Sequence, residues 1–213
     1  MKKIILHGVS THDGAGVKLK RIFAHTYTDI TDPFLLLDHF GSDNPDEYIK
    51  GFPWHPHRGI ETVTYMLEGR MRHTAHMGNE GLLVSGGVQW MTAGKGVIHA
   101  EMPEQTEGRM HGFQLWVNLP AKDKMQPARY QEFAPDSIPQ VTLENGGEAR
   151  VIAGSLQGIS GPVTDIATRA SYFDLHLPAG KQLALPAPAG NTVLVYGYSG
   201  DISIGGKPVA AGH

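Results

Sequence analysis

The sequence predicts an all-β fold for this chain of 213 residues, on two observations. The first is the distribution of its 27 glycines and 14 prolines. They interrupt the chain about every eight to twelve residues, a spacing typical of short strands joined by tight turns. The second is the scarcity of helical periodicity, since only residues 45–48 and 121–130 have the pattern of a short helical turn. We therefore expect a sandwich or barrel of antiparallel strands.

The first half of the chain supplies most of the expected strands. Residues 1–10 and 17–27 are expected to be strands on either side of a flexible turn at 12–16, and the mixed pattern of the second indicates a sheet edge. Residues 32–41 contain four consecutive apolar side chains, which is typical of a strand buried on both faces. Further strands are expected at residues 61–69, 70–76, 81–84, 88–93, 97–102 and 112–119.

A change of composition after Pro120 predicts two domains. The first spans residues 1–120, a polar linker spans 121–134, and the second domain spans 135–213. Strands of the second domain are expected at residues 140–143, 149–153, 171–177, 191–198 and 201–204. The chain stops after a turn at 205–207, where a further strand would pair, so we expect this domain to be truncated.

Composition excludes several classes of protein. With 18 basic and 21 acidic residues and a net charge of −3, the chain has no basic patch that would favour direct nucleic-acid binding. It has no cysteine, so any metal must be bound by nitrogen and oxygen. No apolar run approaches the roughly 18–20 residues of a membrane span, and the one near the N-terminus is too short for a signal peptide. The expected location is the cytoplasm.

Two pairs of candidate metal ligands lie in the first domain, His55 with His57 and His99 with Glu101. Each pair has the spacing i, i+2, and alternate side chains of a β-strand point to the same face. Pro56 lacks an N–H donor, which places the first pair at an edge or entry position of its strand. If the two strands are neighbours, three imidazoles and one carboxylate converge, and this predicts a metal site.

The ligand types restrict the choice of metal ion to a few transition metals. They do not decide which of these is bound, or which of two carboxylates is the fourth ligand. Imidazole and carboxylate suit one divalent ion of iron, manganese, nickel, copper or zinc. We favour Fe(II), because the open positions leave room for dioxygen and a bidentate substrate. Glu61 is a rival to Glu101, since it follows His57 by four residues and shares its face if the strand is regular. Its other role would be to accept a hydrogen bond that orients an imidazole.

The remaining histidines of this half have simpler interpretations. His73 and His76 are three residues apart, so a strand points them to opposite faces, and both are expected at the surface or in a pocket wall together with His111. His39 is expected to bond to nearby backbone or to Asp38. Three large side chains could line an apolar cavity for an aromatic ligand: Trp54, Met91 and Trp116.

Four segments of the first domain closely resemble the pirin family of the cupin superfamily: DPFLLLDHFG, HPHRGIETVTYMLEG, QWMTAGKGVIHAEMPE and HGFQLWVNLP. The resemblance implies a bicupin, two antiparallel β-barrels face to face, with a metal in the N-terminal barrel. It implies that the ligands are His55, His57, His99 and Glu101. The carboxylate would come from the triplet His99-Ala100-Glu101, where the general cupin pattern would use Glu61. Pirin-like proteins usually continue for several more strands, in line with a truncated second barrel.

The resemblance also implies a function. Pirin-like proteins are associated with non-haem iron and with quercetinase activity, in which a flavonol and dioxygen react at the metal and the central ring is cleaved with release of carbon monoxide. Glu101 would then be the general base for the flavonol hydroxyl. An alternative is a non-catalytic metal-binding redox sensor or regulatory module with a protein partner. A third interpretation is a cupin that binds a sugar or a small acid.

Overall fold

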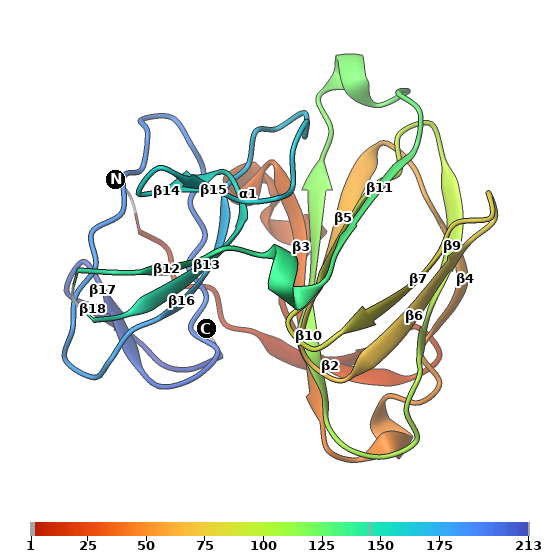
Figure 1. Cartoon of the computed structure of the whole chain (residues 1–213), viewed down its shortest axis with the longest axis horizontal. Helices are drawn as coiled ribbons and strands as arrows, with labels where there is room; N and C mark the ends of the chain where they lie inside the picture. The colour runs from red at the N-terminus through yellow and green to blue at the C-terminus, as the bar shows by residue number, and fades with distance from the viewer. Residues whose placement is uncertain (1–2, 145, 213) are drawn as a thin grey trace.

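Two antiparallel sheets form a barrel in the first part of the chain (Figure 1). The structure, a computed structural model, describes residues 3–144 and 146–212. The larger sheet has seven strands in the order β1-β2-β3-β10-β5-β8-β11, and the smaller has four in the order β4-β9-β6-β7. Their bounds are β1 (Val9–Asp13), β2 (Val17–Phe23), β3 (Phe34–Ser42), β4 (Phe52–His57), β5 (Ile60–Glu68), β6 (Arg70–Ala75), β7 (Glu80–Val84), β8 (Val88–Thr92), β9 (Val97–Pro103), β10 (Met110–Asn118) and β11 (Arg129–Phe133).

The second part has less regular structure and lies beside the larger sheet (Figure 1). It contains one three-stranded sheet and two short hairpins, made by β12 (Gln140–Thr142), β13 (Glu148–Ala153), β16 (Tyr172–His176), β14 (Ser155–Leu156), β15 (Ile159–Ser160), β17 (Ile202–Ile204) and β18 (Lys207–Val209). Helical structure among the described residues is limited to α1 (Thr28–Thr31) and four 3-10 turns, η1 (His25–Tyr27), η2 (Pro45–Glu47), η3 (Ala121–Asp123) and η4 (Pro135–Ser137). None of these is long and apolar enough to cross a membrane.

The all-β prediction is confirmed, and in the first part the expected strands form, with two corrections near the N-terminus. The strand expected at residues 17–27 ends at Phe23, and His25–Tyr27 is the 3-10 turn η1. Residues 3–8 form no strand, whereas His12 and Asp13, expected in the turn, belong to β1. The reason is the register of the hairpin, in which Asp13 pairs with Val17 and leaves only three residues for the turn. Residues 1–2 lie outside the described part of the chain.

In the second part, the strand expected at residues 191–198 is wrong. Its side chains do alternate, because Leu194, Tyr196 and Tyr198 pack on the core while Val193 and Val195 are 45% and 52% exposed. No described strand lies beside it to complete a hydrogen-bonded ladder, however, and a strand needs such a partner. The four other strands predicted here are present in β12, β13, β16 and β17.

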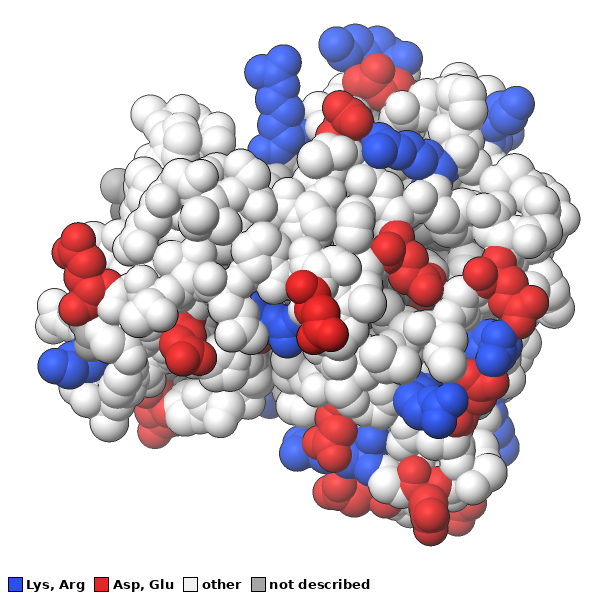
Figure 2. Space-filling view, in the orientation of Figure 1, with Lys and Arg blue, Asp and Glu red and all other residues white. Residues whose placement is uncertain are grey.

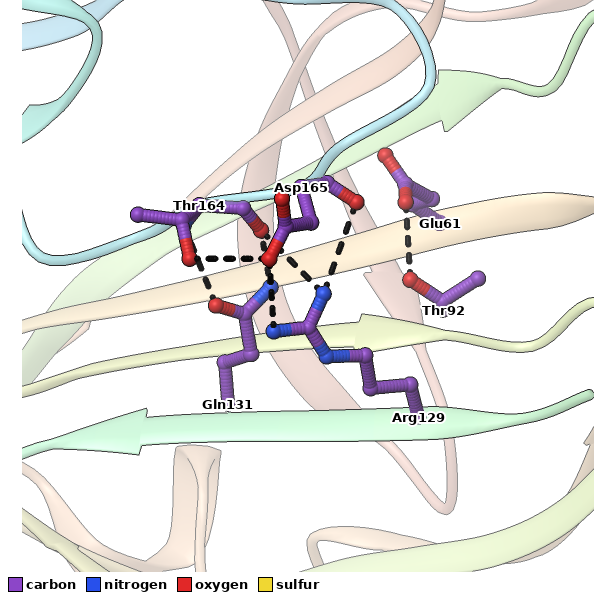
Figure 3. Close-up of polar contacts among 6 residues, drawn as sticks. All are labelled: Glu61, Thr92, Arg129, Gln131, Thr164 and Asp165. Carbon is purple, nitrogen blue, oxygen red and sulfur yellow. Dashed lines mark hydrogen bonds and ion pairs between the residues drawn. The ribbon is translucent and has the colours of Figure 1, made fainter.

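The segment predicted as a linker contributes to the first part. Within residues 121–134, strand β11 pairs with β8 and closes one edge of the seven-stranded sheet. Two side chains of β11 also hold the loop that follows β15 (Figure 3). The Gln131 amide bonds both backbone groups of Thr164, at 2.9 and 3.1 Å, and Arg129 donates to the carbonyl oxygens of Thr164 and Asp165. The strand therefore joins the two parts of the molecule.

The two faces of the seven-stranded sheet have different partners, as strand β5 illustrates. Val63 and Tyr65 belong to a hydrophobic cluster that includes Ile152 and Ile166 of the second part. The intervening Thr64 bonds Glu101 of the smaller sheet, inside the barrel. Because alternate residues point to opposite faces, odd positions of β5 face the second part and even positions face the barrel interior. At the first of these faces, the Tyr65 hydroxyl donates to Asp174 Oδ2 at 2.7 Å.

Charged side chains lie mainly outside these contacts. On the face of the molecule seen in Figure 2, basic and acidic groups are interspersed over both parts and no large patch of one sign is visible. This agrees with the small net charge of −3. The surface of this face gives no sign of the concentrated positive potential that attracts nucleic acid.

The Tyr65–Asp174 bond generates a prediction about stability. Both side chains are buried, and a hydrogen bond to a buried charged group contributes about 1.5–3 kcal/mol. We expect Tyr65→Phe to lower the free energy of unfolding by that amount, measured by urea titration. The exposed Tyr27→Phe serves as the matched control and should change it by less than about 0.5 kcal/mol. Equal stabilities of the two variants would contradict this contribution.

His39 generates a second prediction, about pH. Its Nδ1 lies 2.7 Å from the Tyr196 hydroxyl and its Nε2 lies 2.6 Å from His111 Nε2, between the two parts. Burial, with a smaller effect of the His111 charge, lowers the pKa of His39 to about 4. The unfolded chain binds this proton near pH 6.5, so stability is complete above that pH and falls on acidification towards pH 4. The expected contribution of His39 to the slope is about 1.4 kcal/mol per pH unit.

Measured unfolding free energies between pH 7 and pH 4 check this slope. His39→Gln should reduce the slope by about 1.4 kcal/mol per pH unit, because one titrating group is gone while His57 and His99 still contribute in the same direction. The exposed His76→Gln should leave it as in the unsubstituted protein. A slope that is unchanged in His39→Gln would assign the acid sensitivity to other groups.

Candidate metal centre

Strands β4 and β9 are hydrogen-bonded neighbours, which meets the condition on which the predicted metal site depended. In their antiparallel register, His55 is opposite His99 and His57 is opposite Val97. Strand β4 is an edge strand of its sheet, which accommodates Pro53 and Pro56 because a proline has no N–H to donate to a ladder. The sequence therefore brings the two pairs together through ordinary strand pairing.

Three imidazoles converge on one point. His55, His57 and His99 each offer one ring nitrogen, and these atoms lie within 4.8 Å of one another. The Nε2 atoms of His55 and His99 are 2.9 Å apart. His99 is fully buried and His57 is 7% exposed, so the cluster is largely sealed from water. Of the sequence-predicted ligands, the structure brings these three together.

The hydrogen bonds of the cluster leave nitrogen lone pairs directed at this point. His55 Nδ1 lies 2.8 Å from the Pro53 carbonyl oxygen, which can only accept, so the proton of neutral His55 is on Nδ1 and its Nε2 carries a lone pair. His57 Nε2 is buried without a hydrogen-bond partner among the described residues. Such an unpartnered buried nitrogen is costly unless a ligand satisfies it. The arrangement fits a bound transition metal ion.

Burial keeps two of these imidazoles neutral. Burial, with a smaller effect of the neighbouring imidazoles, lowers the pKa of His57 to about 4 and that of His99 to about 3. Only a neutral imidazole can give its lone pair to a metal. His57 and His99 are therefore in the metal-binding protonation state throughout the physiological pH range.

Glu101 lies beside the three imidazoles but is not part of the tight group. It follows His99 by two residues on β9, is 4% exposed, and lines the same cavity as His55 and His57. Its Oε1 accepts a hydrogen bond of 2.7 Å from the Thr64 hydroxyl. The carboxyl group thus faces the cavity but is tied to the opposite sheet.

Glu61, the rival carboxylate, lies on the other side of the seven-stranded sheet. It is buried, and its Oε1 accepts from the Thr92 hydroxyl at 2.8 Å, on the face that also carries the contacts to Thr164 (Figure 3). The assumed regular strand does not exist, because β4 and β5 belong to different sheets and Gly59 with φ of +70° turns the chain between them. Burial raises the pKa of Glu61, and this residue is not available to the histidine cluster.

The predicted position of His73 is wrong. It was expected at the surface or in a pocket wall, but it is 3% exposed and its Nε2 lies 2.7 Å from His99 Nδ1. The cause is the pairing of β6 with β9, which puts His73 opposite Glu101. This contact fixes the His99 ring so that its Nε2 faces His55, an orientation that metal-binding imidazoles commonly receive from a second residue.

A small cavity of about 40 Å³ adjoins the cluster. Trp116 lines it, as the sequence suggested, and its ring lies 5.1 Å from that of His57. Trp54 is instead 57% exposed, and Met91 is buried in a separate cluster. The cavity is lined by Asp13, Leu19, Leu36, Asp38, Phe40, Phe52, His55, His57, Glu101, Gln114 and Trp116. Its wall is thus partly apolar and partly acidic.

Two of the acidic groups in this wall are already paired. The Arg21 guanidinium donates to Asp13 at 2.6 Å and to both carboxylate oxygens of Asp38, at 2.9 and 2.6 Å. The three residues come from β1, β2 and β3, so this ion cluster fixes the first hairpin against the barrel next to the cavity. Sequence reasoning missed it, because the residues are far apart in the chain and have no common motif.

A two-part, all-β fold with antiparallel sheets and a buried histidine cluster defines the cupin class, and comparison with known proteins agrees. The family model described as Pirin matches residues 16–117. The chain is 52% identical to a Pseudomonas aeruginosa protein named "Putative quercetin 2,3-dioxygenase", over 94% of this chain and 72% of that protein. It is 49% identical to a "Pirin-like protein" of Caulobacter vibrioides, over 97% of this chain and 75% of that protein.

A solved structure has the same architecture. The crystal structure of quercetin 2,3-dioxygenase from Acinetobacter baumannii superimposes with a TM-score of 0.89 at 32% sequence identity, covering 97% of this chain and 75% of that chain. The chain belongs to the pirin family. The bicupin expectation is consistent with this match and with the two β-rich parts of the molecule.

Proposed function

We propose that this chain is a metal-dependent dioxygenase that cleaves quercetin or a related flavonol, and that His55, His57, His99 and Glu101 hold its metal. The observation that carries the proposal is the convergence of three imidazoles within 4.8 Å, of which those of His57 and His99 are buried and neutral. The names of its relatives support the reaction and the substrate class.

The donor set supports one divalent ion, and we propose Fe(II). Three imidazoles and one carboxylate also suit manganese, nickel, copper or zinc, and the affinity order alone would favour copper. When bound, the ion would act as a Lewis acid that binds substrate oxygens and lowers the pKa of a flavonol hydroxyl.

The residues of the chain then have separate tasks. Glu101 is the general base when its metal bond opens, because it lines the cavity and its Oε2, which makes no hydrogen bond to the described residues, can then accept the hydroxyl proton of a flavonol. Trp116 and the other apolar wall residues would contact the aromatic rings and exclude water. His73 keeps the His99 ring in place.

The size of the cavity favours a second candidate, a non-catalytic metal-binding protein that senses redox state or binds a protein partner. Its volume of about 40 Å³ is far below the roughly 300 Å³ of pockets that enclose a ligand of drug size. A flavonol therefore enters only if the wall moves, whereas a sensor needs no such opening. Turnover measurements separate the two candidates.

Metal content is the first test. We expect about one transition metal ion per chain in the purified protein, lost in His99→Ala, because three nitrogen donors become two. Elemental analysis after gel filtration measures it. His76→Ala is the control, since His76 is exposed and its side chain bonds, among the described residues, only to the backbone of Ile98. A protein without metal after anaerobic reconstitution with Fe(II) would exclude both candidates.

Oxygen consumption with quercetin is the second test. We expect loss of turnover in His57→Ala, and in Glu101→Gln a fall in kcat of about 100-fold or more because the base is removed. An oxygen electrode and the visible spectrum of quercetin follow the reaction. If the metal-loaded protein consumes no oxygen with any member of a flavonoid panel, the non-catalytic candidate is the correct one.

A further inference from the structure

The carboxyl group of Glu101 has different surroundings at its two oxygens. Oε1 lies 2.7 Å from the hydroxyl oxygen of Thr64, on the opposite sheet of the barrel. Oε2 makes no hydrogen bond to the described residues. Because Glu101 lines the cavity beside His55 and His57, one oxygen is tied to the wall and the other is left for a group in the cavity.

The Thr64 hydroxyl has a second close contact, which determines where its proton goes. Its oxygen lies 2.7 Å from Glu101 Oε1 and 2.6 Å from Gln114 Oε1, and Thr64 is 2% exposed. A hydroxyl has one proton, and an ionised carboxylate can only accept. The proton therefore goes to Glu101, and the amide satisfies the hydroxyl oxygen when its NH₂ group is turned towards Thr64.

The resulting chain runs in one direction across the barrel. With the Gln114 amide turned so that its NH₂ group faces Thr64, Gln114 donates to Thr64, and Thr64 donates to Glu101 Oε1. Gln114 and Thr64 face each other on paired strands β10 and β5, so both are held by the ladder. The paired backbones of β5 and β10 thus fix the position of the Thr64 hydroxyl that binds the Glu101 carboxyl group.

We propose that Thr64 is a positioning residue, whose hydroxyl fixes Oε1 of Glu101 and leaves Oε2 as the oxygen directed at the three histidines. The inference rests on the proposed function, because it takes Glu101 to be a metal ligand. A carboxylate restrained at one oxygen binds through the other without losing further rotamer freedom. Thr64 therefore controls how tightly the metal is held.

Co(II) is a suitable probe, because its visible absorption bands report both the affinity and the ligand set. Removal of a hydrogen bond that orients a ligand commonly costs 10–100-fold in metal affinity. We expect Thr64→Val, which keeps the shape and removes the hydroxyl, to weaken Co(II) binding by about that factor and to change the bands. Thr64→Ser keeps the hydroxyl and should restore both.

The matched control is Thr62→Val. Thr62 lies two residues away on β5, on the same face, is 3% exposed, and its hydroxyl makes no hydrogen bond to the described residues. Its loss should leave Co(II) affinity unchanged. Thermal unfolding of the metal-free variants shows whether each one folds, and Thr64→Ala provides the same measurement if valine perturbs the fold.

A double-mutant cycle with Glu101→Ala tests whether Thr64 acts through the carboxyl group. In that background Thr64→Val should weaken Co(II) binding no further, because the group it positions is absent. Equal losses in the two backgrounds, or unchanged affinity in Thr64→Val, would overturn this inference and leave the proposed function standing. Absence of Co(II) binding to the unsubstituted protein would overturn both.

Discussion

The antiparallel pairing of β4 with β9 is the constraint on which the candidate centre depends. Its register sets His55 opposite His99, and the alternation of side chains along β4 adds His57 on the same face. A shift of the register by one residue would turn one of the two histidine pairs away from the other. On its other side β9 is held by β6. Strand β4 is at the edge of its sheet, where its prolines offer no hydrogen-bond donor to a further strand.

Burial determines the protonation state of His57 and His99. The same desolvation that lowers the pKa values of His57 and His99 would be costly if their nitrogens stayed without partners. His73 and the Pro53 carbonyl each satisfy one nitrogen of a neighbouring ring and direct the other at a common point. The cluster is thus oriented and in part unsatisfied, and its two buried imidazoles are neutral, which is the state that a metal ion stabilises.

The seven-stranded sheet connects this centre to the rest of the molecule. Its inner face carries Thr64 and Gln114 towards Glu101, and its outer face carries Val63 and Tyr65 into the contact with the second part. One strand, β5, serves both purposes because successive residues point to opposite faces. The second part therefore supports the sheet that holds the carboxyl group, although within the described residues it contributes no side chain to the histidine cluster.

Local pattern determined much of this protein from the sequence alone. The distribution of glycine and proline predicted most of the strands of the first part. The i, i+2 spacing predicted which histidines share a face of their strand, and His55, His57 and His99 do converge. Both signals act over only a few residues of the chain. What depended on long-range pairing had to come from the tertiary structure. His73 was misplaced because its contact with His99 requires knowledge that β6 lies beside β9. Glu61 was kept as an alternative ligand to Glu101, because its even spacing from His57 places the two side chains on one face only if both residues lie on the same strand. In the structure they lie on strands of different sheets. The same limit hid Thr64, since a threonine in a strand shows nothing in sequence of the carboxyl group that faces it across a barrel.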